Sequence, residues 1–272
     1  MSFLDFLFPR RCLGCGQGGG YFCSSCLNSV LLKEERICPM CGKGSVGGLT
    51  HPVCRQPQGL DGLTSIFSYK GIVEKAIKKL KYKFVYDLAE DLVGLFLSFC
   101  GEDQALVDFC HKEGVSLVPI PLHPRRLRWR GFNQSELLGK MIAQNLGLPF
   151  CPDLLLRVKL TRPQVELSRK EREKNVAGAF AFNRKIISAH PFRPADLLRN
   201  SRGKPPNLKG ACPVSPKGFT GAHPCLSRPV GIVSRFVLLF DDVWTSGATL
   251  REAARALKRA GAKRVWGLTI AR

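Results

Sequence analysis

The chain of 272 residues and 30.1 kDa is long enough to bury a sizeable core, and its hydrophobic fraction of 44% is typical of a globular protein of one or two domains. Its 42 basic and 21 acidic residues give a net charge of +21, which predicts attraction to nucleic acid or to an anionic membrane surface, with a merely solvated basic surface as the alternative. No apolar run is long enough for a transmembrane segment, and residues 3–8 are too short and acid-interrupted for a secretory signal, so we expect a cytoplasmic, reducing location.

The first 58 residues are rich in cysteine and are predicted to form a zinc-binding segment. Seven of the twelve cysteines precede residue 55 and form three Cys-x-x-Cys pairs, which a His-x-x-Cys pair follows. The eight candidate ligands are Cys12, Cys15, Cys23, Cys26, Cys38, Cys41, His51 and Cys54. Two pairs complete a tetrahedral site, so the spacing predicts two structural zinc ions, and no βαβ pattern supports a thioredoxin-like redox role. Sequential pairing is the simplest arrangement, and a crossed arrangement stays open.

From residue 59 to residue 272 the composition is that of an α/β domain. Residues 65–69 and 115–119 are predicted as strands, because they are short apolar runs. Helical periodicity predicts helices at residues 71–82, 88–99 and 135–145. The first of these helices carries a stripe of lysines opposite its apolar face, which we interpret as a solvated face or as an anion-binding one.

An arginine-rich segment, residues 121–134, is predicted as a loop between the second strand and the third helix. Its arginines are Arg125, Arg126, Arg128 and Arg130. Clustered guanidinium groups repel one another unless an anion lies among them, and arginine suits bidentate contacts with phosphate. The segment is therefore a candidate anion-binding loop.

Two later segments show little sustained periodicity. Residues 161–180 are predicted as an exposed loop with one or two helical turns, capped by Ser168. Residues 184–235 contain eight prolines, ten basic residues and one acid, and we predict a disordered or loosely packed insertion. This insertion is either a basic arm for nucleic acid or a neutral loop.

The strongest functional motif starts as an apolar strand at residues 236–240 and ends in two acids, Asp241 and Asp242. A loop of small residues follows, before a helix predicted at residues 251–260: Thr245, Ser246, Gly247, Ala248 and Thr249. Ligands of open α/β sheets bind beyond the carboxyl ends of the strands, and a helix N-terminus suits a phosphate. The acids suit ribose hydroxyls, so the motif predicts a ribose 5-phosphate site. The alternative is a strand–loop–helix with solvated acids and capping threonines.

The Asp-Asp and Thr-Ser-Gly-Ala-Thr motifs resemble the loop with which type I phosphoribosyltransferases bind phosphoribosyl pyrophosphate (PRPP). Together with the cysteine-rich start, Arg-Gly-Phe-Asn-Gln at residues 130–134, Leu-Ser-Arg at 167–169 and Asn-Val-x-Gly-Ala-Phe at 175–180, they make the chain similar to the competence-associated ComF family. Two features depart from the family pattern. His51 stands where the family usually has cysteine, and residues 184–235 exceed the usual short connection.

The resemblance implies a type I phosphoribosyltransferase-like parallel sheet behind a zinc-binding segment. It also implies PRPP binding with Mg²⁺, in which Asp241 and Asp242 hold the ribose hydroxyls and residues 245–249 hold the 5-phosphate. The four arginines, with Lys78 and Lys81 as weaker candidates, would contact pyrophosphate or nucleic acid, while His123 is a possible general base or a residue that shapes the loop.

The implied partners are PRPP, single-stranded DNA and proteins of the competence machinery, in DNA uptake during natural transformation. Two alternatives stay open. The chain could be an active phosphoribosyltransferase acting on an unidentified base or amine, or a PRPP-responsive regulator without enzymatic activity whose zinc-binding segment contacts a partner.

Overall fold

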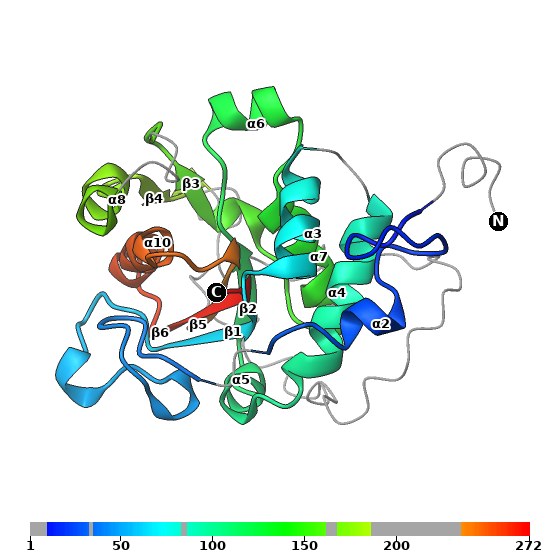
Figure 1. Ribbon diagram of the computed structural model, residues 1–272. Coiled ribbons are helices and arrows are strands. Elements are labelled where there is room, and N and C mark those ends of the chain that lie inside the picture. The colour runs from blue at the N-terminus through cyan, green and yellow to red at the C-terminus, as the bar shows by residue number, and fades with distance from the viewer. Residues whose placement is uncertain (1–9, 33–34, 83–85, 162–167, 186–234) are drawn as a thin grey trace.

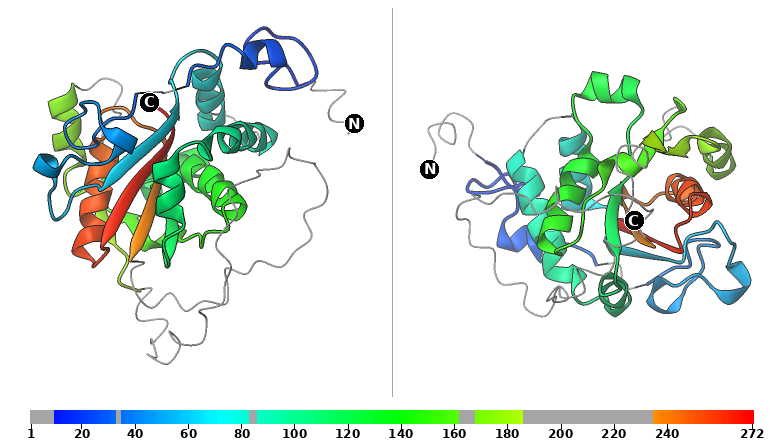
Figure 2. Two further views of the ribbon diagram at one scale, coloured as in Figure 1. Left: turned by 90° about the horizontal axis from the view of Figure 1, so that it is seen from below. Right: turned by 180° about the vertical axis from the view of Figure 1, so that it is seen from behind.

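The computed structural model describes residues 10–32, 35–82, 86–161, 168–185 and 235–272, and a four-stranded parallel sheet lies at its centre (Figure 1). The strands are β1 (Gly62–Phe67), β2 (Val115–Pro119), β5 (Phe236–Val243) and β6 (Arg264–Ala271). Their order is β1-β6-β5-β2, and all three pairings are parallel. Figure 2 shows the strands side by side with helices on both faces. The predicted α/β class with a parallel sheet is confirmed.

Both faces of the sheet are buried, because alternate residues of β5 pack in two different clusters. Leu238 and Phe240 belong to one cluster, and Val237 and Leu239 belong to the other. The first face is covered by helices α3 (Gly71–Tyr82), α4 (Tyr86–Cys100), α5 (Gln104–Cys110) and α7 (Gln134–Asn145). The second is covered by α10 (Ala248–Arg259) and a ribbon of the antiparallel strands β3 (Leu155–Arg157) and β4 (Phe180–Phe182).

Where apolar periodicity is strong, the predicted elements match the structure. Helix α3 and strand β2 have the predicted bounds, and α4 and α7 extend their predicted helices by one or two residues at an end. The strand predicted at residues 65–69 lies at Gly62–Phe67, and the helix predicted from residue 251 begins at Ala248. That earlier start places Thr249 inside the helix.

The arginine-rich segment contains a helix, α6 (Pro124–Arg130), so the prediction of a loop was wrong. Pro124 occupies the first turn, where its missing N–H group is not needed. The His123 side chain caps the helix, because its Nδ1 accepts a hydrogen bond of 3.2 Å from the backbone N–H of Arg125. Gly131 ends it with a φ of 82°, which glycine adopts readily. The helix buries none of its residues, so it lacks the apolar stripe by which a sequence reveals a helix.

The described part of the segment predicted as an exposed loop, residues 168–180, is more regular than a loop. Helix α8 (Arg169–Val176) starts at a capping box of Ser168 and Glu171, which agrees with the predicted helical turns. The β3–β4 ribbon was missed because three-residue strands are too short to show a period. Almost all of the predicted insertion, residues 186–234, lies outside the described residues.

The cysteine-rich segment packs against both sides of the sheet (Figure 1). It contains α2 (Ser24–Leu27) and the 3₁₀ turns η1 (Val46–Gly48) and η2 (Pro52–Cys54). A third 3₁₀ turn, η3 (Pro152–Leu154), belongs to the α/β domain and precedes β3. Cys12 and Tyr21 are buried in the cluster under α3 and α4, whereas Ile37 is buried in the cluster under α10. Within the described part of the chain, no helix is both long and apolar enough to span a bilayer.

Candidate functional site

The loop between β5 and α10 has the geometry of an anion-binding turn. Gly247 has a φ of +75°, and a Cβ atom there would lie 2.1 Å from the Trp244 ring, so this position requires glycine. Gly247 is also the N-cap of α10 and has no side chain to cap the helix. The Ser246 hydroxyl accepts a long hydrogen bond of 3.4 Å from the backbone N–H of Ala248. Backbone N–H groups and the positive end of the helix dipole therefore face the carboxyl edge of the sheet.

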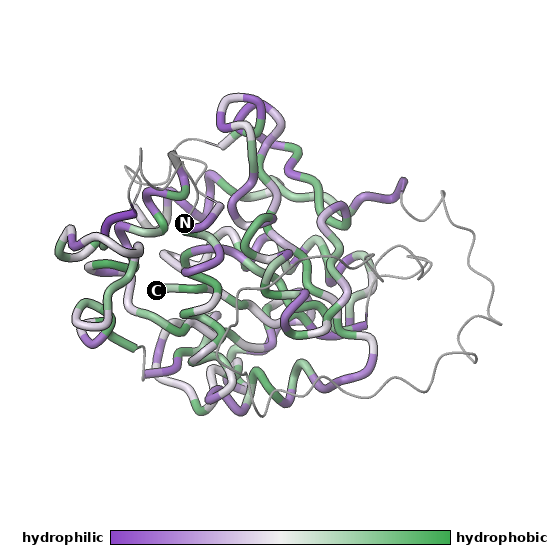
Figure 3. Tube along the Cα trace, turned by 90° about the vertical axis from the view of Figure 1, so that its right-hand side faces the viewer, coloured by the Kyte–Doolittle hydropathy of each residue, from purple (hydrophilic) through white to green (hydrophobic). Residues whose placement is uncertain are grey.

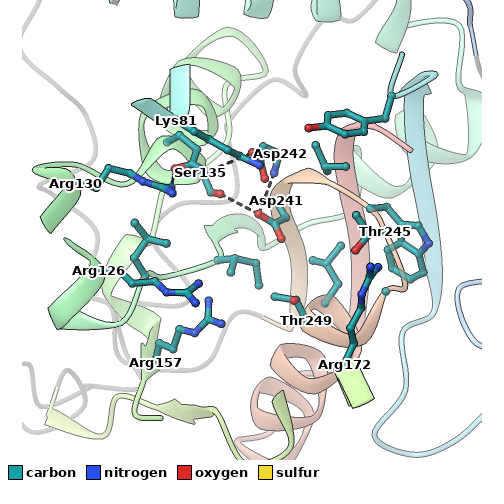
Figure 4. Close-up of a pocket in the computed structure, with 18 of the residues that line it drawn as sticks. Lys81, Arg126, Arg130, Ser135, Arg157, Arg172, Asp241, Asp242, Thr245 and Thr249 are labelled. Carbon is teal, nitrogen blue, oxygen red and sulfur yellow. Dashed lines mark hydrogen bonds and ion pairs between the residues drawn. The ribbon is translucent and has the colours of Figure 1, made fainter. Parts of the chain in front are cut away.

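A pocket of about 600 Å³ lies at this edge (Figure 4). Its wall combines the two acids and the loop with residues of α3, α6, α7, β3 and α8 and with residues that follow β1 and β2. The polar and aromatic residues that line it are Tyr69, Lys81, Arg126, Trp129, Arg130, Gln134, Ser135, Arg157, Arg172, Asp241, Asp242, Trp244, Thr245 and Thr249.

The two acids have different neighbours. Asp242 forms an ion pair of 2.9 Å with Lys81 and accepts a hydrogen bond of 3.2 Å from the Gln134 amide. Asp241 accepts a hydrogen bond of 3.0 Å from the Ser135 hydroxyl and another of 3.0 Å from the backbone N–H of Asp242. The start of α7 and the end of α3 therefore hold the two carboxylates in place.

These neighbours move the pKa values of the two acids apart. Burial, together with the charge of Asp242, raises the pKa of Asp241 to about 7. Burial acts in the same direction on Asp242, but the Lys81 ammonium and the Gln134 hydrogen bond outweigh it and lower the pKa of Asp242. Lys81 in turn has a raised pKa, because its attraction to Asp242 exceeds its own burial cost. The pair thus holds one carboxylate that ionises readily, Asp242, and one that keeps its proton to a higher pH than an ordinary aspartate, Asp241.

Two arginines form the wall opposite the loop, and Figure 4 shows their guanidinium groups pointing into the pocket. Arg126 donates a hydrogen bond of 2.7 Å to the backbone carbonyl of Thr161, and Arg157 donates one of 2.7 Å to the Thr161 hydroxyl. Arg157 is 8% exposed, and among the described residues its Nε has no hydrogen-bond partner. Burial and the neighbouring Arg126 lower the pKa of Arg157 to about 10. A buried cation beside a second cation is costly without an anion, so this wall is suited to bind one.

The structure brings most of the predicted site residues together. Asp241, Asp242, Thr245, Gly247 and Thr249 line one pocket with Lys81, Arg126 and Arg130, while Ser246 and Ala248 lie in the same turn. Three predicted anion-binding residues do not line it. Arg125 and Arg128 are exposed on α6, and Lys78 pairs with Glu74 at 2.6 Å on α3. His123 caps α6, which agrees with the interpretation that it shapes this segment.

Gln134, Ser135 and Arg157 are site residues that the sequence interpretation did not assign. The first two stand at the start of α7, where they contact the two acids. Gln134 is the last residue of the Arg-Gly-Phe-Asn-Gln motif, so the motif could have indicated that it belongs to the site. Arg157 stands in a three-residue strand with no local motif, so its position depends entirely on the tertiary fold.

The eight candidate zinc ligands form two groups of four in the sequential arrangement. The ligand atoms of each group lie within 4.8 Å of one another: Cys12, Cys15, Cys23 and Cys26 in the first, Cys38, Cys41, His51 and Cys54 in the second. In the second group the Cys41 Sγ lies 3.5 Å from the His51 Nδ1. The His51 Nε2 lies 2.9 Å from the Gly44 carbonyl, which it reaches as a donor when Nδ1 faces a metal. The donor sets and their spacing fit two structural zinc ions.

The other described cysteines have no such grouping. Cys100 and Cys110 are buried in the core under α4 and α5, and burial raises the pKa of their thiols to about 11 and about 12. Thiols of this kind are inert, which agrees with the absence of ligand spacing around them. Cys212 and Cys225 lie outside the described residues.

These features together define a class: an α/β protein with a sheet consistent with the type I phosphoribosyltransferase fold, a polar pocket at its carboxyl edge and two structural zinc sites. Residues 3–57 match the family of the double zinc ribbon domain.

Known proteins resemble the chain over most of its length. It is 26% identical over 275 residues to Competence protein F of Haemophilus influenzae, covering 98% of each chain. It is 25% identical over 258 residues to the DNA utilization protein YhgH of Salmonella typhimurium, covering 90% of this chain and 88% of that protein. With Competence protein ComFC of Bacillus subtilis the identity is 24% over 249 residues, covering 88% and 78%. The predicted resemblance to the ComF family is confirmed.

Proposed function

We propose that the chain binds PRPP with Mg²⁺ in the carboxyl-edge pocket, binds single-stranded DNA through its basic surface, and acts in DNA uptake. The observation that carries the PRPP part is the joining, in one pocket, of the turn at residues 245–249, the two acids and a wall that contains the buried Arg157 and the half-buried Arg126. The names of the relatives support the role in DNA uptake, since they are competence and DNA utilization proteins.

Each part of PRPP has a chemically matched part of the pocket. The 5-phosphate suits the N-terminus of α10, where backbone N–H groups and threonine hydroxyls are donors. The ribose hydroxyls suit the carboxylates of Asp241 and Asp242, which are acceptors. The pyrophosphate suits Arg126 and Arg157, because its charge would offset the cost of burying Arg157 beside the half-buried Arg126. Mg²⁺ would bind to the pyrophosphate oxygens, with Asp241 as an available carboxylate ligand.

Calorimetry with three ligands tests this assignment. PRPP with Mg²⁺, ribose 5-phosphate and inorganic pyrophosphate are titrated separately into the wild type, Asp241→Asn, Asp242→Asn and Arg157→Met. We expect the Asn variants to bind PRPP and ribose 5-phosphate at least tenfold more weakly, because a hydrogen bond to a charged group contributes about 1.5–3 kcal/mol. Arg157→Met should lose pyrophosphate and PRPP affinity but keep ribose 5-phosphate affinity.

A matched control is Asp153→Asn, which removes a carboxylate that is exposed and outside the pocket. It should bind all three ligands as the wild type does. Unchanged PRPP binding in Asp241→Asn and Asp242→Asn would contradict the assignment. The DNA part is tested separately by a gel shift with single strands over a salt series, and a lack of binding even at low salt would contradict it.

A second candidate, phosphoribosyl transfer to a base or an amine, is favoured by the position of Asp241 in the pocket wall together with its raised pKa. A carboxyl group that titrates near pH 7 can serve as a general acid or base at neutral pH. This candidate predicts PRPP-dependent release of pyrophosphate with some member of a panel of bases and amines, abolished in Asp242→Ala. PRPP binding without release for any acceptor would instead favour a regulatory role, with the zinc-binding segment contacting a protein of the competence machinery.

A further inference from the structure

Helix α6 has two faces with different surroundings. Arg126 and Arg130, four residues apart, face the pocket. Arg125, Arg128 and Trp129 are spaced by three and four residues, so they neighbour one another on the exposed face of the helix, which Trp129 joins to the pocket rim. The helix projects from the body of the molecule at the top of Figure 1, and Figure 3 shows it there as a largely hydrophilic turn.

Trp129 is unusual among the tryptophans of this chain. It is 72% exposed, whereas Trp244 and Trp266 are 6% and 3% exposed. Leu127, the next apolar side chain of the helix, is 40% exposed. The indole of Trp129 therefore leaves most of a large flat apolar surface in water, and it stands at the rim of the pocket, whose wall it joins.

The arginines beside Trp129 carry charge that no described acid neutralises. No carboxylate of the described residues lies within 4.0 Å of the guanidinium group of Arg125 or Arg128. The partner of this face must therefore offer both negative charge and flat apolar groups. Single-stranded nucleic acid offers both, because its phosphates alternate with unstacked bases.

Other polyanions fit the face less well. Double-stranded DNA keeps its bases stacked inside the helix, and an acidic peptide offers charge without flat rings at matching intervals. An anionic membrane surface would require apolar residues along a continuous stripe, and this side of α6 interleaves its indole with two arginines.

We infer that the exposed face of α6 is a contact surface for single-stranded DNA, on which a base stacks on Trp129 while Arg125 and Arg128 contact the flanking phosphates. This inference rests on the single-strand binding proposed above and gives it a location. Because Trp129 stands at the pocket rim, the bound strand would cross the mouth of the pocket.

Tryptophan fluorescence tests the stacking directly, because Trp129 is the exposed indole of the described chain. A 20-nucleotide thymine strand at low salt should quench the wild-type emission, and the quenching should disappear in Trp129→Phe. Trp129→Ala should bind the same strand about tenfold more weakly by gel shift, since stacking on an aromatic side chain contributes that much for one base. Trp129→Phe keeps an aromatic ring and should retain most of the affinity.

Salt dependence tests the arginines. In Arg125→Gln/Arg128→Gln the slope of log affinity against log salt should fall by about 0.7 for each phosphate that the variant no longer neutralises. The matched control, Lys263→Gln/Arg264→Gln, removes the same charge from exposed residues at the start of β6, the opposite end of the sheet, and should keep the wild-type slope. Circular dichroism and thermal unfolding of every variant exclude a folding defect.

The outcomes separate this inference from the proposal on which it rests. If the wild type binds the strand while Trp129→Ala binds it equally well and the emission is unquenched, the inference is overturned and the DNA-binding surface lies elsewhere. Quenching by anionic vesicles or by an acidic peptide, but not by the strand, would also overturn it. A wild type that binds no single strand at low salt would refute the DNA proposal itself, and the PRPP calorimetry would be unaffected.

Discussion

At the scale of single residues, the adjacent acids differ because of what the fold places beside each one. Lys81 and Gln134 surround Asp242 and keep it ionised, whereas the main neighbour of Asp241 is the hydroxyl of Ser135. The sequence shows two identical carboxylates, and the structure assigns them different protonation behaviour. This difference in protonation should affect the free energy of unfolding as well as ligand binding.

The raised pKa of Asp241 predicts a loss of stability as the pH rises. An unfolded aspartate loses its proton near pH 4, while the folded Asp241 holds it to about pH 7, so the folded state binds more protons between these values. Stability then falls with increasing pH across this window. Relative to Asp241→Asn, the wild type should lose up to about 4 kcal/mol in free energy of unfolding between pH 4 and pH 8.

Denaturant unfolding at intervals of one pH unit measures this difference. Asp153→Asn is the control, because that carboxylate is exposed, and its difference from the wild type should stay flat. A wild type that gains stability relative to Asp241→Asn as the pH rises would show that the folded state favours the ionised form of Asp241, against the electrostatics described here.

At the scale of elements, some helices and strands are determined by a local sequence pattern, whereas others depend on the tertiary fold. The apolar stripe of α3 and the apolar run of β2 set their bounds without help from the rest of the chain, so both could be predicted. Helix α6 has no buried residue and ribbon strand β3 has three residues, so neither carries a period that a sequence can reveal. The acid pair and its loop are contiguous and predictable, but Arg157 reaches the same pocket only through the β3–β4 pairing.

Helix α10 is tied to its surroundings by Arg251 in its first turn. This guanidinium group donates hydrogen bonds to the Ser246 carbonyl at 2.8 Å, to the Pro39 carbonyl at 3.0 Å and to the Glu173 carboxylate at 2.9 Å. It also lies 5.8 Å from the centre of the Trp244 ring. One side chain therefore joins the anion-binding turn, the second zinc group and α8.

Replacing Arg251 should loosen the turn without touching the ligand-binding atoms. We expect Arg251→Met to bind ribose 5-phosphate about tenfold more weakly, because the Ser246 carbonyl loses a charged hydrogen-bond donor. For the same reason, hydrogen exchange at the backbone amides of residues 244–249 should be faster. Arg251→Lys should recover part of the affinity, since an ammonium can satisfy one of the carbonyls.

The control on the same helix is Arg255→Met, whose side chain is more exposed and pairs with Glu252 one turn away from the anion-binding turn. Amide exchange and calorimetry should leave this variant close to the wild type. Equal effects of the two substitutions would mean that α10 as a whole, and not the contacts of Arg251, holds the turn.

At the scale of the whole molecule, the cysteine-rich segment is attached to both sides of the sheet. On one side Arg10 pairs with Asp87 at 2.8 Å, and the Lys79 ammonium lies 4.9 Å from the centre of the Tyr21 ring. At the β1 edge of the sheet Arg36 pairs at 3.1 Å with the buried Asp103, the N-cap of α5, and donates to the Ser65 carbonyl of β1 at 2.8 Å. Ile37, the next residue, is buried in the cluster of the second face. The division of the chain near residue 58 stays a prediction, and these contacts indicate that the two parts stabilise each other.

The two zinc groups should therefore differ in their effect on the pocket. Pro39 stands between Cys38 and Cys41, so loss of the second zinc releases the carbonyl that Arg251 binds. Cys41→Ser and Cys15→Ser should each lose one zinc per chain and some stability, because binding of a structural zinc is coupled to folding. Only Cys41→Ser should also weaken ribose 5-phosphate binding, because the first group packs near α3 and α4, away from the turn. Metal content by a colorimetric chelator and calorimetry on the same samples test this, and an equal loss of affinity in both variants would refute a specific link from the second zinc group to the anion-binding turn.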